Sequence, residues 1–186
     1  MKNNFIEQLT KNNIVTGLIW ENSNSESNAK GYRQWIEATK KSHHQVVYAD
    51  KQNRNHYGYT DKPVLQHDPF ATYINTQFGD GIYYVATAED HYYLLIINNG
   101  QIMSGTDQLI SKAFFNEVVR LVPTSAYCHL EIIPLQDKHI ETVVLLCEKR
   151  KKRLRKQRVF FYSALLLAGI GILGLTLVLL DFFFSG

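Results

Sequence analysis

The chain has 186 residues, of which 45% are hydrophobic and 20% are charged, and its formal net charge is +3 at pH 7. Residues 149–158 (KRKKRLRKQR) carry eight of its twenty Lys and Arg residues, so residues 1–148 alone have a net charge of −4. This distribution argues against a nucleic-acid-binding surface in the first 148 residues. Two cysteines, Cys128 and Cys147, are too few for a disulfide framework or a zinc site.

The first third of the chain alternates between short strands and helices. Residues 1–12 form an N-terminal arm, either loose or folded as a short helix. Apolar, β-branched runs predict strands, polar runs predict turns, and spaced aromatic residues predict a helix. The expected elements are a buried strand at 14–20 (IVTGLIW), a polar turn at 22–28 (NSNSESN), a helix from there to Lys41, and strands at 44–49 and 56–60.

The clearest helix signal begins at residue 68. Asp68 is placed to cap a helix, Pro69 suits its first position, and Gly79 ends it. Strands are then expected at 81–87, 92–98 and 101–104. The Asn99-Gly100 pair predicts a type I′ hairpin turn between the last two strands, because both residues tolerate a positive φ.

A further helix is expected to begin at Thr106 or Asp107 and to end near Leu121. Its apolar stripe would consist of Ile110, Ala113, Phe114, Val118 and Leu121. A strand at 127–133 and a final helix capped by Asp137 complete the predicted elements. Residues 13–148 therefore predict one mixed α+β domain.

Residues 159–180 (VFFYSALLLAGIGILGLTLVLL) contain no charged residue. A helix of this length extends about 33 Å, which matches a bilayer hydrocarbon core of about 30 Å. We expect a transmembrane helix at 159–180, a basic juxtamembrane segment at 149–158 and a short periplasmic tail at 181–186. No residue typical of a helix end separates the last helix of the domain from the span, so one continuous helix is expected.

Basic residues beside a span are retained on the cytoplasmic side, which places residues 1–158 in the cytoplasm. The basic segment is also expected to contact anionic lipid headgroups, and a nucleic-acid-binding tail is the alternative interpretation. The expected membrane-surface residues are Lys149, Arg150, Lys151, Lys152, Arg153, Arg155, Lys156 and Arg158.

Small residues in the span favour close contact between two copies of the helix. The expected contact residues are Ala164, Ala168, Gly171 and Gly174. Residues 169–174 also fit the G-x-G-x-x-G pattern of dinucleotide-binding proteins. That motif acts between a strand and a helix N-terminus, so its position inside an apolar span excludes this function.

The sequence predicts no enzyme, cofactor or metal site. It contains no G-x-x-x-x-G-K-[ST], G-x-S-x-G, H-E-x-x-H or C-x-x-C motif. His43 and His44 are adjacent in a predicted strand, and adjacent strand residues point to opposite faces. Asp90 and His91 fall at a predicted turn, where Asp is expected for turn formation alone.

Two pairs of tyrosines lie in neighbouring predicted strands. In each pair, one ring is expected to face the core and the other the solvent, because successive strand residues alternate between faces. The solvent-facing rings are either partner contacts or cross-strand pairs on the sheet surface. The candidate partner surface comprises Tyr83, Tyr84, Tyr92 and Tyr93.

Several segments together resemble the inner-membrane accessory proteins of type IVB pili, the PilO-type and bundle-forming-pilus group. The resemblance covers about residues 14–180. It rests on the Gly17-Leu18-x-Trp20 strand, on the VVYA strand, and on residues 81–107, whose aromatic strands and Asn-Gly turn end in Gly105-x-Asp107. A basic stretch and a single span follow in the expected place.

This resemblance implies an actin-like, RNase-H-like domain, similar to the cytoplasmic domain of the type II secretion L-protein. Such domains dock the hexameric assembly ATPase and a polytopic platform protein at the bacterial inner membrane, and they do not hydrolyse nucleotide. Family members usually continue past the span, whereas this sequence stops six residues beyond Leu180. The alternatives from the residues alone are a membrane-anchored sensory or small-ligand-binding domain and an anchored hydrolase.

Overall fold

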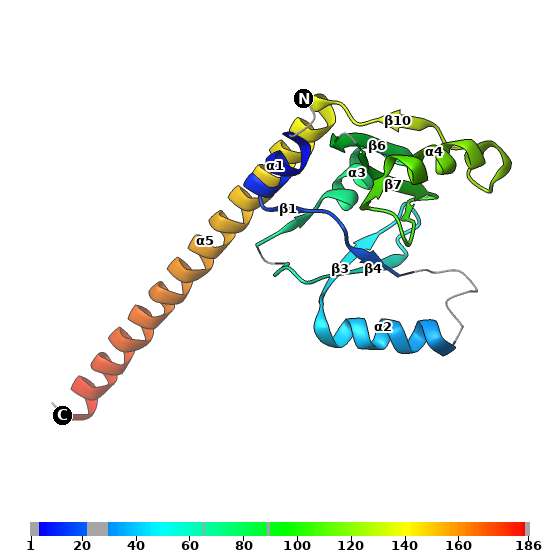
Figure 1. The fold of residues 1–186 in the computed structure, drawn as a ribbon. Helices are drawn as coiled ribbons and strands as arrows, with labels where there is room; N and C mark the ends of the chain where they lie inside the picture. The colour runs from blue at the N-terminus through cyan, green and yellow to red at the C-terminus, as the bar shows by residue number, and fades with distance from the viewer. Residues whose placement is uncertain (1–3, 22–29, 65, 89, 185–186) are drawn as a thin grey trace. The chain divides into compact units, whose positions relative to one another are not determined.

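The computed structural model describes residues 4–21, 30–64, 66–88 and 90–184, which form a mixed α/β protein with five α-helices and several sheets (Figure 1). The mixed α+β class predicted from the sequence is therefore confirmed. The chain divides into two compact units, residues 1–147 and residues 148–186. The predicted turn at 22–28 and the last two residues of the predicted tail lie outside the described residues.

The largest sheet has five strands: β6 (Gly81–Ala88), β7 (His91–Asn98), β8 (Gln101–Ile102), β9 (Gln108–Ser111) and β10 (Ile132–Pro134). β6 and β7 form an antiparallel hairpin, and β10 pairs in parallel with the free edge of β6. Both β8 and β9 pair with β7 on its other side. The predicted Asn99-Gly100 turn is confirmed, with φ of 53° and 74°, as a type I′ turn requires.

Two smaller sheets come from the first seventy residues. β2 (Ile19–Trp20), β4 (Asn55–Thr60) and β3 (His44–Ala49) form an antiparallel sheet in that order, and α2 (Lys30–Ser42) lies between β2 and β3 in the chain. β1 (Ile14–Val15) pairs in parallel with β5 (Asp68–Pro69). The predicted strands at 44–49 and 56–60 are confirmed as β3 and β4.

Both faces of the central β6–β7 hairpin are buried. Residues of α1 (Asn4–Lys11), α3 (Phe70–Phe78) and the first turns of α5 (Asp137–Phe184) pack with Tyr83 and Tyr93 on one face. On the opposite face, α4 (Lys112–Leu121) packs its Phe115 against Ile82 and Leu94. The unit is therefore a three-layer structure, and residues 4–11 form a helix of its core rather than a loose arm.

The prediction of a single strand at 14–20 is wrong. The chain turns at Gly17, which has a φ of 80°, a conformation that glycine adopts without steric cost. β1 before the turn and β2 after it join different sheets. The apolar run is continuous in sequence because both halves are buried, so the run alone does not reveal the turn.

The prediction of a helix from Thr106 or Asp107 to Leu121 is wrong over its first six residues. Gln108–Ser111 forms strand β9, and α4 begins after Ser111, whose Oγ accepts a hydrogen bond from Phe114 N (3.2 Å). The later start changes which residues face inward. Phe115 is buried, whereas Phe114 and Leu121 of the predicted stripe are 54% and 45% exposed.

Two smaller predictions also need correction. Asp68 does not cap α3, because it lies in β5 and its Oδ1 accepts a hydrogen bond from the Tyr73 hydroxyl (3.1 Å). Pro69 occupies the N-cap position, without a side-chain capping bond, while Gly79 ends the helix as predicted, with a φ of 79°. The strand expected at 127–133 is limited to β10, which begins at Ile132.

The continuous final helix is confirmed, because α5 runs without a break from Asp137 to Phe184. Its first turns belong to the core through Ile140, Val143 and Cys147. At its start, His139 is buried, and its Nδ1 accepts a hydrogen bond from Gln136 N (2.9 Å). The His139 ring therefore closes the first turn of the helix.

Candidate functional site

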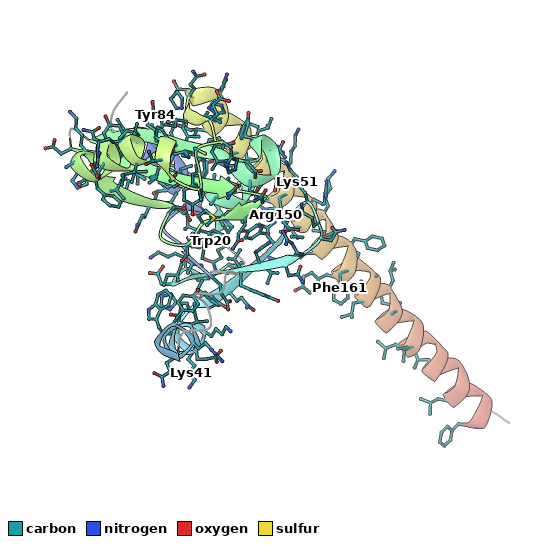
Figure 2. All side chains as sticks on the ribbon, turned by 90° about the vertical axis from the view of Figure 1, so that its right-hand side faces the viewer. Trp20, Lys41, Lys51, Tyr84, Arg150 and Phe161 are labelled. Carbon is teal, nitrogen blue, oxygen red and sulfur yellow. The ribbon has the colours of Figure 1, made fainter. Side chains whose placement is uncertain are left out.

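The second compact unit has the composition of a membrane anchor. Among the described residues, one helix is long and apolar enough to cross a membrane, and none of its apolar window is buried. Arg150 and Phe161 mark the change from basic to apolar side chains along it (Figure 2). Within this helix, Ala164, Ala168, Gly171 and Gly174 are exposed, so their role in helix pairing stays a prediction.

Seven of the eight predicted membrane-surface residues are exposed, and Lys151 is partly exposed. Residues 149–158 contain no acidic residue. A helix with about 3.6 residues per turn distributes eight cations over ten positions around its whole circumference. The basic segment therefore presents positive charge in every direction perpendicular to its axis.

The four tyrosines of the predicted partner surface are buried or only partly exposed in the structure. Tyr83 and Tyr93 are fully buried, and Tyr84 and Tyr92 lie on the opposite face of the hairpin, as the strand alternation predicted. That second face is not open to solvent, because Phe115 of α4 stacks on Tyr92 (ring centroids 4.4 Å apart) and packs on Tyr84 (4.8 Å). Tyr84 and Tyr92 are therefore only partly exposed.

Asp107 is the most enclosed polar group of the first unit. Its side chain accepts three hydrogen bonds, from the Tyr93 hydroxyl (2.6 Å), from Trp20 Nε1 (3.0 Å) and from Leu18 N (3.1 Å). Its backbone carbonyl accepts a fourth, from Gly17 N (2.7 Å). Asp107 is 0% exposed and has a φ of 61°, a conformation that Asp tolerates better than most residues.

Burial raises the pKa of Asp107 to about 7, although the bonds from Tyr93, Trp20 and Leu18 act to lower it. Burial beside this carboxyl also raises the pKa of Tyr93 well above its usual value. The segments that carry the family resemblance, Gly17-Leu18-x-Trp20 and Gly105-x-Asp107, thus meet at one buried carboxyl group. This contact fixes the β1–β2 turn against the large sheet.

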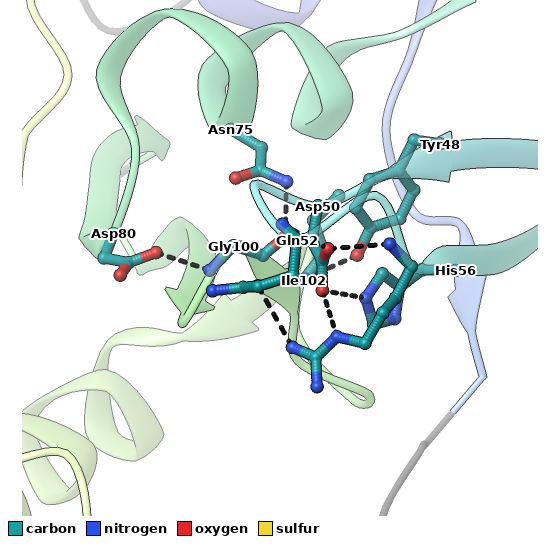
Figure 3. Close-up of polar contacts among 9 residues, drawn as sticks. Tyr48, Asp50, Gln52, His56, Asn75, Asp80, Gly100 and Ile102 are labelled. Carbon is teal, nitrogen blue, oxygen red and sulfur yellow. Dashed lines mark hydrogen bonds and ion pairs between the residues drawn. The ribbon is translucent and has the colours of Figure 1, made fainter.

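A second polar cluster is centred on Asp50, at the turn between β3 and β4 (Figure 3). Asp50 Oδ1 accepts hydrogen bonds from Gln52 N (2.8 Å) and Arg54 N (2.9 Å), and Oδ2 contacts Arg54 Nε (2.8 Å) and His56 Nε2 (3.0 Å). Burial alone would raise the pKa of Asp50, but these hydrogen bonds hold that pKa well below its usual range. The bond from His56 has the largest lowering effect.

The Asp50 turn packs on the Asn99-Gly100 hairpin. Gly100 N donates to Asp80 Oδ1 (2.8 Å), Gly100 O accepts from Asn75 Nδ2 (2.7 Å), and a Cβ at Gly100 would lie 3.2 Å from the Asp50 Cβ. Because each Asp50 oxygen has two contacts and the side chain is buried, the carboxylate is not available as a base. The cluster is best explained as a connection between the sheets.

A pocket of about 360 Å³ opens beside the β1–β2 turn. Its walls come from three parts of the chain: residues 15–17 with Ile19, His43 directly after α2, and residues 59–62. Tyr59 and Thr60 are buried, whereas Asp61 and Lys62 are exposed at the rim. Because Gly17 belongs both to this wall and to the Asp107 contact, the Asp107 hydrogen bonds position the pocket.

The remaining residues singled out from the sequence have local contacts in the structure. His43 Nδ1 lies 2.8 Å from Ser42 Oγ, and His44 is exposed and pairs with Thr60 across β3 and β4. Asp90 lies in a turn, as predicted, and its backbone O accepts a hydrogen bond from Lys112 N (2.8 Å). In this part of the chain, no group of three or more His, Cys, Asp or Glu side chains could hold a metal ion.

Sequence reasoning missed the roles of Asp107, Asp50 and Thr60. The sequence predicted Asp107 as a helix cap, Asp50 as the start of the turn after the strand at 44–49, and Thr60 as the last residue of the strand at 56–60. Comparison of the chain with protein-family models, with curated proteins and with solved structures gives no match.

Proposed function

We propose that this chain is a single-pass scaffold of a type IV pilus assembly platform, related to type II secretion, in the bacterial inner membrane. The observation that carries the proposal is helix α5, which is continuous from the core of the first unit through eight cations into an uncharged stretch. Positive charge on one side of a span keeps that side in the cytoplasm. Residues 1–147 would then face the cytosolic machinery.

The sheet order supports the actin-like, RNase-H-like assignment of the first unit. An RNase-H-like sheet has three antiparallel strands, then a helix and a fourth strand that lies parallel to the first. Here β6 and β7 are antiparallel, β8 and β9 share the third position, and β10 follows α4 and pairs in parallel with β6. In this proposal the domain docks the assembly ATPase and a polytopic platform protein and does not hydrolyse nucleotide.

Two exposed side chains of α4 are the best candidates for the docking contact. Phe114 and Leu121 are separated by seven residues, so they lie on the same face of the helix two turns apart. They are 54% and 45% exposed. Large apolar side chains gain most from burial at an interface. Of the tyrosines predicted as a partner surface, Tyr84 and Tyr92 are covered by Phe115 of α4, and Tyr83 and Tyr93 are fully buried on the other face.

The proposal is tested by co-purification of the full-length chain, in detergent, with the assembly ATPase and the platform protein encoded beside it. We expect the ATPase to be retained by the immobilised chain. Exchange of Phe114 and Leu121 for Ser should weaken retention about tenfold or more. Val47→Ser is the matched control, since Val47 is 53% exposed on β3 and its loss should change nothing. Absence of the ATPase from the eluate would refute docking.

A second candidate function is a membrane-anchored sensory or small-ligand-binding domain. One observation favours it: the pocket of about 360 Å³ beside the β1–β2 turn falls within the size range of small-molecule sites. A docking scaffold does not require this pocket. Ligand titration of the full-length chain, with and without the ATPase, separates the two functions.

A further inference from the structure

The pocket beside the β1–β2 turn is rich in hydrogen-bond donors. Thr60 is 7% exposed, and its Oγ accepts a bond from Lys62 N (3.2 Å), but within the described residues its hydroxyl donates none. Thr16 also lines the pocket, and its side chain makes no hydrogen bond in this part of the chain. Both hydroxyls are therefore available to a group that accepts hydrogen bonds.

Two nitrogen-bearing side chains add to these donors. Lys62 lies at the rim, and its Nζ is 3.5 Å from Asp61 Oδ2. His43 uses Nδ1 for its contact with Ser42, so its Nε2 has no partner among the residues that the structure describes. The polar side chains that line the pocket are thus one carboxylate, one permanent cation, one imidazole and two hydroxyls. Because donors outnumber the single carboxylate, the pocket favours a negatively charged ligand that accepts hydrogen bonds over a cation.

Part of the wall of the pocket is apolar. Val15 and Ile19 come from β1 and β2, and Tyr59 of β4 is the residue paired with Ile19 between the two strands. The Tyr59 hydroxyl donates to Glu21 Oε2 (2.7 Å), so its polar end is already occupied. A ligand would meet carbon on this side, which favours a molecule with an apolar body.

We infer that this pocket binds a small organic acid, a carboxylate or phosphate ester with a compact apolar body. The acidic group contacts the hydroxyls of Thr16 and Thr60 and the Lys62 ammonium, and the body packs on Val15, Ile19 and Tyr59. The Asp107 contact holds Gly17 and Leu18 in place and so gives the pocket its shape before any ligand arrives.

This inference does not depend on the docking proposal. The pocket is formed by β1, β2, β4 and His43 directly after α2, whereas Phe114 and Leu121 lie on α4. Loss of ligand binding and loss of ATPase retention are therefore separate outcomes of separate experiments.

The test is a ligand titration of the full-length chain in non-ionic detergent. Binding is monitored by NMR through the nitrogen-15 amide resonances of Gly17 and Thr60. The probes are benzoate, phenyl phosphate, inorganic phosphate and benzylamine. Benzoate and phenyl phosphate should shift both resonances and saturate with a Kd of about 1 mM, which is reasonable for ligands of this size. Benzylamine, with the same ring and the opposite charge, should shift neither.

Variants connect the binding to the named side chains. Lys62→Met removes the charge and keeps the stem, and it should raise the Kd about tenfold. Thr16→Val is isosteric and should raise it about threefold. Lys112→Met on α4 is the charge-matched control and should leave the Kd unchanged. Unchanged spectra away from the pocket show that each variant is folded.

Three results would overturn the inference. The first is an absence of saturable shifts at about 10 mM benzoate and phenyl phosphate, tenfold above the expected Kd. The second is equal affinity for benzylamine. The third is a Kd in the Lys62→Met and Thr16→Val variants equal to that of the Lys112→Met control. Inorganic phosphate should bind more weakly than phenyl phosphate, and equal affinity would refute the role of the apolar wall.

Discussion

Replacement of Asp107 tests how much of the domain depends on one buried carboxyl group. Asp107→Ala leaves the Tyr93 hydroxyl, Trp20 Nε1 and Leu18 N without their acceptor inside the protein. Each buried, unpaired donor costs about 1–3 kcal/mol, and Ala at a positive φ adds about 1 kcal/mol. The three donors and the backbone cost together predict a loss of about 4–10 kcal/mol, which is comparable to the whole free energy of unfolding of a typical domain, about 5–15 kcal/mol.

Asp107→Asn is the matched variant. Asn tolerates the same backbone conformation, and its carbonyl oxygen can still accept from Trp20 and Leu18 while its amide faces the Tyr93 oxygen. The expected cost is about 1–2 kcal/mol. The comparison thus separates the loss of the hydrogen bonds from the loss of the ionisable group.

Urea denaturation of the full-length chain in detergent, followed by the fluorescence of Trp20, measures both variants. The only other tryptophan, Trp35, is 47% exposed, and Trp35→Phe makes the signal specific. A cost below about 1 kcal/mol for Asp107→Ala, less than one unpaired donor, would refute the reasoning. An equal cost for Ala and Asn would refute the assignment of the loss to hydrogen bonds.

The same comparison has a pH dependence of defined sign. Burial raises the pKa of Asp107 from 3.8 to about 7, so between these values the folded state binds a proton that the unfolded state has released. Stability therefore falls as pH rises from about 4 to about 7, by at most about 4 kcal/mol. The difference in unfolding free energy between the wild type and Asp107→Asn should change over this window, and a flat difference would contradict it.

Three further predictions concern other parts of the chain. Burial lowers the pKa of His139, so stability should decrease as pH falls below about 6.5, and thermal melts of His139→Gln should lack this decrease. Gly58→Ala would place a Cβ 2.4 Å from the ring of Trp20; it should cost about 1–3 kcal/mol, and an unchanged urea midpoint would contradict this. Exchange of basic residues in 149–158 for Gln should reduce partition into anionic vesicles by about 1 kcal/mol each, with no change for neutral vesicles.

The elements that were predicted correctly are those defined by local chemistry. The Asn99-Gly100 turn, the end of α3 at Gly79 and the alternation of Tyr83 and Tyr84 each depend on a few adjacent residues. The same is true of the unbroken final helix, because no Gly or Pro occurs in residues 149–158, between the last helix of the domain and the span. These features need no information from distant parts of the chain.

The errors arise where a distant residue decides the conformation. Gly17 turns because the chain on either side joins different sheets, and Asp107 leaves the helical conformation because Trp20 and Leu18 supply its partners. Three residues with capping ability, Thr106, Asp107 and Ser111, precede α4, and the sequence does not show which one is used. Because α4 begins at Lys112, later than predicted, Phe114 is exposed, whereas the predicted apolar face of the helix placed it in the core.

The contact between Leu18 and Asp107 also has a kinetic consequence, because these residues are 89 positions apart in the chain. Closing a flexible loop of that length costs about 4 kcal/mol in entropy, whereas a hairpin such as β6–β7 forms in microseconds. The hairpin is therefore expected to form first and the Leu18–Trp20 segment to dock late. Weakening that late contact should accelerate unfolding much more than it slows refolding.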